Sequence, residues 1–82
     1  MESCLMTVVC RSDLSTLARV VSILHARRTP IVGLRYAAGP DTAGLECDVR
    51  SEGAELLAAQ VRRAIGVLSV EVRRPVVVAV AS

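Results

Sequence analysis

The residues that could do chemistry are few and lie far apart in the 82-residue sequence. His25 is the one histidine, and it has no nearby nucleophile and carboxylate with which it could form a catalytic arrangement. No pair of histidines or cysteines has metal-binding spacing, and the glycines match no phosphate-binding loop. The sequence therefore predicts no catalytic residue, no metal site and no cofactor in this chain.

The cysteines indicate packing rather than redox chemistry. Cys4, Cys10 and Cys47 are odd in number, lack a C-x-x-C spacing and lie inside apolar or alternating segments. We expect them to be small core residues in a reducing compartment. The chain does not begin with a basic segment followed by a long apolar run, and no apolar run reaches the roughly 20 residues that a membrane span needs. We therefore expect a cytoplasmic protein.

Composition favours a small domain that has a partner. Hydrophobic residues make up 52% of the chain, but Tyr36 is the one aromatic residue, so the core must be aliphatic. All ten basic residues are arginines, and eight acidic residues leave a formal charge of +2, which is too small to indicate nucleic-acid binding. A domain of this length buries only just enough apolar surface to fold, so help from a second subunit is expected.

The elements that must position these residues follow from hydrophobic periodicity. A strand is predicted over about residues 3–11 and a helix from there to about Arg27, capped by Ser12 or Asp13. Thr29-Pro30 should end that helix. One apolar stripe along it is predicted to face the core: Leu17, Val20, Val21 and Leu24.

The second half of the chain repeats this alternation of strand and helix. A strand is predicted over residues 31–38, a hairpin loop over 39–44 and a third strand over 45–50. A second helix over 53–65 should bury Leu57, Val61 and Ile65 before Gly66 stops it, and a last strand should cover 67–72. The β-prone tail at 75–82 is expected to extend the last strand beyond Arg73-Arg74 or to form an arm onto another subunit.

This order predicts one α+β domain at residues 1–74 with the ferredoxin-like βαββαβ fold, followed by the tail at 75–82. A four-stranded antiparallel sheet should carry both helices on one face. RNA-recognition modules share this topology but stack bases on aromatic residues, which the central strands lack. Metallochaperones share it too, but they need a pair of cysteines after the first strand, where this chain has Cys10 alone.

The junction of the first strand and first helix carries a family resemblance. The segment 8–20, with Leu17-Ala18-Arg19-Val20, and the later Ile23-Leu24 and Arg27-Arg28 resemble the opening of an ACT domain. More narrowly, they are similar to the small regulatory subunit of acetolactate synthase, a thiamine-diphosphate-dependent enzyme of branched-chain amino acid synthesis. The resemblance implies a non-catalytic activating subunit that forms a homodimer through its second strand.

The departures from that family concern its effector site. Ser15 stands where the family has a turn glycine, Ile31 stands where it has an asparagine that binds the effector, and Thr29-Pro30 replaces Gly-Tyr. The chain thus resembles the short, valine-insensitive small subunits. Any remaining effector, such as a branched-chain amino acid, is expected at a site formed by two chains: Asp13, Leu14, Ser15 and Thr16 of one, with Ile31 and Val32 of its neighbour.

The catalytic subunit would be contacted through an exposed arginine face, predicted to consist of Arg19, Arg62 and Arg63, together with the tail. Two other functions stay open at this stage. The chain could be a stand-alone ACT sensor that binds an amino acid and regulates another enzyme, or a structural dimerisation module. Binding of branched-chain amino acids separates the sensor from the other two functions.

Overall fold

The computed structural model describes residues 3–28 and 31–74. The predicted tail at 75–82 and the Thr29-Pro30 segment lie outside the described residues. The elements follow the predicted order: β1 (Ser3–Arg11), α1 (Leu14–Arg27), β2 (Ile31–Ala38), β3 (Thr42–Arg50), α2 (Ala54–Arg62) and β4 (Val67–Arg73). The predicted βαββαβ fold is confirmed.

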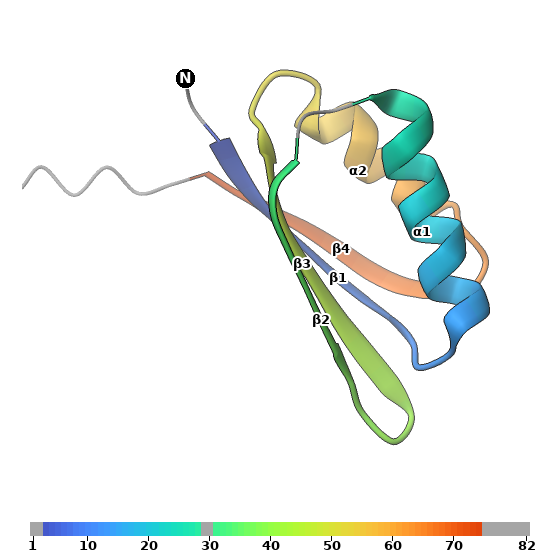
Figure 1. Ribbon diagram of the computed structural model, residues 1–82. Helices are drawn as coiled ribbons and strands as arrows, with labels where there is room; N and C mark the ends of the chain where they lie inside the picture. The colour runs from blue at the N-terminus through green and yellow to red at the C-terminus, as the bar shows by residue number, and fades with distance from the viewer. Residues whose placement is uncertain (1–2, 29–30, 75–82) are drawn as a thin grey trace, which may run out of the picture.

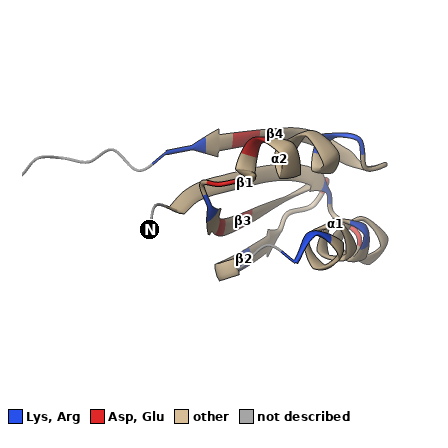
Figure 2. Ribbon diagram, turned by 90° about the horizontal axis from the view of Figure 1, so that it is seen from above, with Lys and Arg blue, Asp and Glu red and all other residues tan. Residues whose placement is uncertain are grey.

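The strands form one antiparallel sheet in the order β2-β3-β1-β4. Figure 1 shows both helices on the same side of this sheet, and Figure 2 shows the strands side by side with charged residues of both signs spread over several elements. β1 therefore lies in the middle, as its nearly unbroken apolar sequence predicts. β2 and β4 are the edges, and the described residues leave one face of the sheet without a cover.

Alternation along the two central strands builds the core. On β1 the residues Cys4, Met6, Val8 and Cys10 are buried under the helices, while the residues between them are less buried. On β3 the buried set is Ala43, Leu45, Cys47 and Val49. The helices contribute Val20, Leu24, Ala54, Leu57, Ala58 and Val61. The predicted aliphatic core is confirmed, and it lies between the sheet and the helices.

The three cysteines are buried free thiols, so their predicted role as core residues is confirmed. Burial raises the pKa of the Cys47 thiol to about 11, with the charge of Asp48 adding to the effect. The pKa of Cys10 is raised for the same main reason, with Asp13 as the nearby charge. Neutral, buried thiols of this kind react slowly with disulfides and electrophiles.

The predicted end of the second helix is wrong. α2 stops at Arg62, and Ile65 is exposed rather than packed in the core. The chain reverses here through two tight turns, in which Ala64 N–H donates to the Val61 carbonyl and Val67 N–H donates to the Ala64 carbonyl. Gly66 completes the reversal with a φ of 95°. The turn into β4 thus ends the helix before Ile65, although the apolar periodicity of the sequence continues to that residue.

The predicted hairpin loop is too long, because β3 begins at Thr42 and only Gly39 to Asp41 turn. Gly39 N–H donates to the Thr42 carbonyl at 2.9 Å and closes the turn. Gly44 pairs with Val9 of β1 on one side and Ala37 of β2 on the other. Hydrogen bonding to two neighbouring strands outweighs the turn preference of Ala43-Gly44.

The predicted apolar stripe of α1 is partly wrong. Val20 and Leu24 are buried and Leu17 packs partly against the core, but Val21 is exposed. The third core-facing position is Thr16, four residues before Val20, and it is the one buried polar residue in the described part of the chain. α1 is rotated so that Val21 lies at the side of the helix nearest β2.

Candidate functional site

The candidate site is the exposed side of the molecule formed by α1 and the edge strand β2, which we call the α1–β2 groove. Its lining is mainly apolar and encloses about 390 Å³: Val21, Leu24, His25, Arg28, Ile31 and Leu34. Leu34 pairs with buried Cys47 in the strand register, so it points to the helix side of the sheet, yet it is 47% exposed. α1 therefore does not cover β2, and an apolar strip stays open along this edge.

β2 is also open along its backbone. Within the described residues it pairs only with β3, and every residue of it is exposed or half-buried. A bulge interrupts its register between Ile31 and Gly33, and Val32 in this bulge is 79% exposed. Unpaired backbone groups beside exposed apolar side chains are the features that let one strand pair with another chain.

The predicted effector residues at the start of α1 form a helix cap. The Asp13 carboxylate accepts a hydrogen bond from Thr16 N–H at 2.7 Å, so Asp13 is the cap among the two predicted alternatives. This bond lowers the pKa of Asp13, and the charges of Arg11 and Arg19 lower it further. Leu14 is exposed, whereas Thr16 is buried against the loop that leads to β4. A carboxylate therefore already occupies the end of α1 where an anionic effector group would bind.

The other two predicted effector residues, Ile31 and Val32, lie at the opposite end of the sheet. Ile31 is level with Val49, which pairs with Cys4 near the start of β1, whereas Asp13 follows the end of β1. Within one chain the two halves of the predicted site are therefore not brought together. Only a second copy, paired antiparallel along β2, would bring its Ile31 toward Asp13. The effector site stays a prediction that depends on this pairing.

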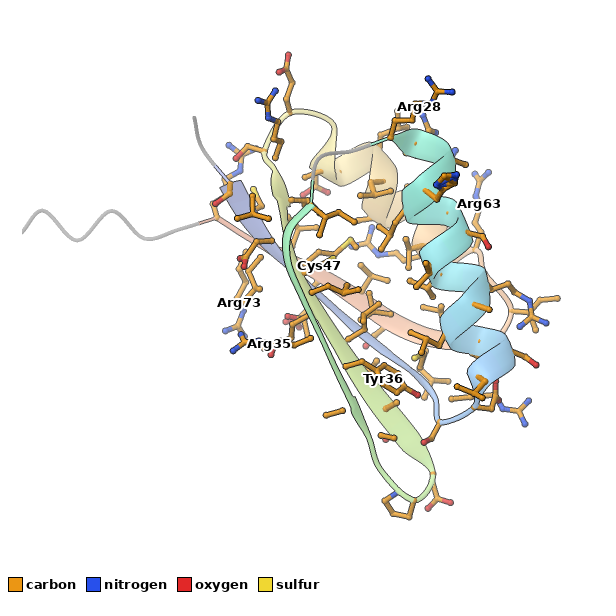
Figure 3. The ribbon with its side chains drawn as sticks, in the orientation of Figure 1. Arg28, Arg35, Tyr36, Cys47, Arg63 and Arg73 are labelled. Atoms are coloured by element: carbon orange, nitrogen blue, oxygen red, sulfur yellow. The ribbon has the colours of Figure 1, made fainter. Side chains whose placement is uncertain are left out.

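The predicted arginine face is partly engaged with the chain itself. Arg19 Nη1 donates to the Ile65 carbonyl at 3.0 Å, and Arg62 Nη2 donates to the Val70 carbonyl at 2.9 Å. Both bonds tie a helix to the segment around β4. Figure 3 shows Arg63 on the outer side of the helical layer, and its side chain makes no hydrogen bond or ion pair among the described residues. Arg63 is therefore the member of this face best placed to contact a partner.

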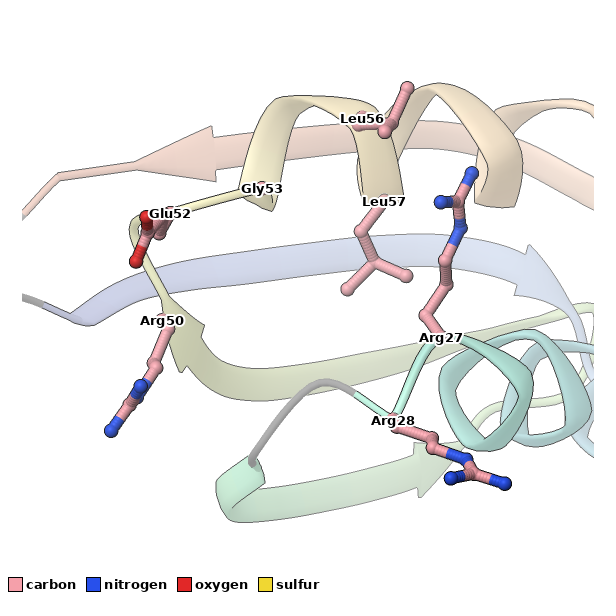
Figure 4. Close-up of a pocket in the computed structure, with 7 residues that line it drawn as sticks. All are labelled: Arg27, Arg28, Arg50, Glu52, Gly53, Leu56 and Leu57. Atoms are coloured by element: carbon pink, nitrogen blue, oxygen red, sulfur yellow. The ribbon is translucent and has the colours of Figure 1, made fainter.

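A second hollow, of about 320 Å³, lies where the end of α1 meets the start of α2, and no motif in the sequence indicates it. Its lining includes Arg27, Arg28 and Arg50, and Arg27 Nε donates to the Gln60 side chain at 2.8 Å. Figure 4 shows that Arg28 and Arg50 point away from each other. The three arginines therefore do not converge on one ligand. Arg27-Arg28 in the sequence signals only a helix end, and its proximity to Arg50 depends on the tertiary fold.

Two further observations concern metals and membranes. No group of three metal-ligating side chains comes together within residues 3–28 and 31–74. In the same residues, neither helix is long and apolar enough to cross a membrane.

Comparison with solved structures gives clear likenesses. The ACT domain of GTP pyrophosphokinase from Chlorobium tepidum matches with a TM-score of 0.74 and 14% identity, covering 85% of this chain and 83% of that one. The chain has the fold of an ACT domain. The regulatory subunit of aspartate kinase from Thermus thermophilus matches with a TM-score of 0.70 and 12% identity, over 88% of this chain and 50% of that one. The C-terminal domain of the MgtC protein from Mycobacterium tuberculosis matches at 0.68 with 20% identity, over 92% and 88% of the two chains.

These identities are low, so the likenesses establish the fold of this ACT-like domain and nothing finer. Comparisons with protein families and with curated protein sequences find no match. The resemblance to acetolactate synthase small subunits is carried by the sequence alone.

Proposed function

We propose that the chain is a non-catalytic regulatory subunit that works as a homodimer joined along β2. The observation that carries this proposal is the open β2 edge beside the α1–β2 groove. Two copies paired antiparallel along β2 would make one continuous eight-stranded sheet, because each copy contributes four strands. The pairing would satisfy the free backbone groups and cover Leu34 and Ile31, both of which are exposed in a single chain.

The finer proposal is that this dimer activates the catalytic subunit of acetolactate synthase without valine feedback. Support comes from the resemblance around Leu17-Ala18-Arg19-Val20 and from the cap at α1. The Asp13 carboxylate accepts the Thr16 N–H, one of the first-turn donors that a ligand carboxylate would need, and its negative charge repels such a group. Ile31 offers no polar side-chain atom to an amino acid. The dimer would act by binding the active arrangement of the enzyme more tightly than the inactive one.

Co-expression with the large subunit of an acetolactate synthase from the same organism tests this function. We expect the two chains to elute together and the activity of the large subunit to rise in a way that valine does not reverse. Arg63→Glu should weaken this association, whereas the matched reversal Arg73→Glu, on the side of the sheet opposite the helices, should not. A large subunit that elutes alone, with unchanged activity, would rule out the proposal.

The second candidate, a stand-alone amino-acid sensor, is favoured by one observation. The α1–β2 groove is apolar along Val21, Leu24 and Leu34 and has the Arg28 guanidinium and the His25 imidazole among its lining groups. This combination suits an aliphatic side chain with a carboxylate nearby. Isothermal titration of the purified protein with valine, leucine and isoleucine separates the two functions. Saturable binding supports the sensor, and absence of heat from a folded dimer supports the activating subunit.

A further inference from the structure

The face of the sheet opposite the helices has a charge pattern that is complementary to itself. Figure 3 shows Arg35 and Arg73 projecting on this side, away from α1 and α2. Leu5, Thr7 and Val9 of the central strand β1 run along the middle of the face and are half-buried by their neighbours alone. Two hollows lie on it, one of about 580 Å³ that includes Thr7 and one of about 200 Å³ that includes Leu5.

The strand register places the charged side chains in two rows across the sheet. The first row runs from β2 to β4 as Arg35, Glu46, Thr7 and Glu71. It starts with a cation at one edge and ends with an anion at the other. Arg35 Nη2 lies 3.5 Å from Glu46 Oε1, with the Arg35 side chain exposed and the Glu46 side chain half-buried.

The second row has the opposite polarity. It runs from β2 to β4 as Gly33, Asp48, Leu5 and Arg73. The Asp48 carboxylate leans over Gly33, since a Cβ placed on that glycine would lie 3.1 Å from Asp48 Oδ2. The negative charge of this row is therefore at the β2 edge and the positive charge is at the β4 edge.

A two-fold axis parallel to the strands, running between β3 and β1, superposes the two edges. This axis places a second sheet against the first, so that β4 of each copy lies over β2 of the other. Each row of one copy then lies over the same row of the other copy. Arg35 then faces Glu71 of the second copy. Arg73 of the second copy lies over Gly33, beside the Asp48 carboxylate that leans over this glycine, and each pair occurs twice. Packed sheets lie about 10 Å apart with their strands about 30° from parallel, a gap that long side chains from both sheets can span.

We infer that this face binds a second copy of the same chain, sheet against sheet. The two rows and the hollows of the face carry Arg35, Arg73 and Arg74 against Glu46, Asp48 and Glu71, so their charges balance. A nucleic acid would need an excess of cations and would gain from aromatic side chains, but Tyr36, the one aromatic residue, lies on the helix side of the sheet. Mixed charges with a small, apolar middle suit a second copy of this chain instead.

This contact is separate from the pairing along β2. The β2 edge joins two sheets side by side, whereas the open face joins two sheets front to front. A chain that uses both would form species larger than a dimer. The face-to-face contact consists of exposed charges around a small apolar strip, so we expect it to weaken at high salt.

Charge reversal at the two ends of the first row tests the inference. In Arg35→Glu, both facing pairs become two carboxylates, and in Glu71→Arg both become two guanidiniums, so each variant should repel itself. A mixture of the two variants restores an opposite pair at both positions. We therefore expect light scattering to show at most half the native mass for each variant alone, and the native mass for the equimolar mixture.

Reversals on the helix side, Glu55→Arg and Arg63→Glu, serve as controls and should keep the native mass. Circular dichroism confirms that each variant is folded. The mass of each single variant should be halved if the native species is a dimer through this face alone, and also if it is a larger assembly that uses β2 as well. The result therefore does not depend on the proposed function. Single variants of native mass, or a mixture that stays small, would overturn the inference.

Discussion

At the scale of single residues, the contact between Thr16 and Gly66 fixes how the start of α1 meets the chain before β4. Gly66 has a φ of 95°, and a Cβ there would lie 2.5 Å from Thr16 Oγ1. The Gly66 carbonyl also accepts a hydrogen bond from Arg11 N–H at 2.8 Å, at the end of β1. One residue thus joins β1, α1 and the entry to β4, and it needs both a positive φ and the absence of a side chain.

Three glycine substitutions separate these two requirements. Gly44→Ala meets nothing within 4 Å and has an ordinary φ, whereas Gly53→Ala has open space but a φ of 81°. We expect Gly44→Ala to be nearly neutral, Gly53→Ala to lower the free energy of unfolding by about 1 kcal/mol and Gly66→Ala by about 3 kcal/mol. Urea unfolding measures all three. Equal losses at Gly53 and Gly66 would show that the Thr16 contact costs nothing.

The cap at Asp13 should make stability depend on pH. The hydrogen bond from Thr16 N–H lowers the pKa of Asp13 in the folded chain, so the charged form contributes stability above the unfolded-state pKa, about 3.9. That contribution is lost as pH falls through the folded-state pKa. We expect the gap in urea midpoint between the native chain and Asp13→Ala to be constant from about pH 5 to 7 and to narrow below about pH 4. A gap independent of pH would show that the charge plays no part in capping.

The sequence allows a cap at Ser12 or Asp13 to be predicted, because capping depends on a few residues of local chain, and the hydrogen bond from Thr16 N–H identifies Asp13. Thr16 and Ile65 could not be placed in the same way. The burial of Thr16 depends on Gly66, fifty positions later in the sequence. Ile65 satisfies the helical period, but it lies outside the core because the chain turns before β4. Local patterns thus identify caps, and distant contacts decide which side chains are buried.

At the scale of elements, the edge position of β2 is the feature that matters for function. Its eight residues and its ending at Ala38 could be predicted from the sequence. The sequence could not predict that α1 leaves β2 uncovered, because the hydrophobic stripe of α1 does not determine how far the helix lies from each strand. The α1–β2 groove results from the position of α1 relative to β2, so no motif in the sequence predicts it.

Leu34→Glu tests whether β2 and the groove pair two copies. A carboxylate at this half-exposed apolar position would be buried without a partner in the dimer, so the dissociation constant should rise at least tenfold, about 1.4 kcal/mol. Leu56→Glu is the matched control, because Leu56 is 57% exposed on α2 and Leu34 is 47% exposed on β2. Sedimentation equilibrium measures both variants. Equal effects at the two positions would argue against a specific interface at β2.

At the scale of the whole molecule, the core is small and consists of aliphatic side chains, methionine and cysteine. Three of its buried residues are cysteines, and Met6 is the largest of its fully buried side chains. A single copy also leaves Ile31, Val32 and Leu34 exposed at one edge. Association stabilises such a domain more than it stabilises a larger one. The apolar area buried between subunits is a sizeable fraction of the area that each small chain buries alone.

Thermal unfolding should therefore depend on protein concentration. If the dimer dissociates as it unfolds, the melting temperature should rise by roughly 4 °C for each tenfold increase in concentration. In Leu34→Glu the melting temperature should be lower and should depend less on concentration, because pairing along β2 no longer contributes. Differential scanning calorimetry over a hundredfold concentration range makes the comparison. A native chain whose melting temperature stays constant would be stable as a monomer.

The position of β1 in the sheet has a consequence for how the protein is made. Leu5 pairs with Arg73, so the central strand gains its last neighbour only when the chain has been synthesised through β4. Until then β1 has a bare edge, and Cys4, Met6 and Val8 lack part of their cover. A ribosome adds about 5–20 residues each second, so this intermediate, with its exposed apolar strand edge, persists for seconds on every new chain. Chaperones that shield nascent strands would therefore affect the yield of this protein more than its final stability suggests.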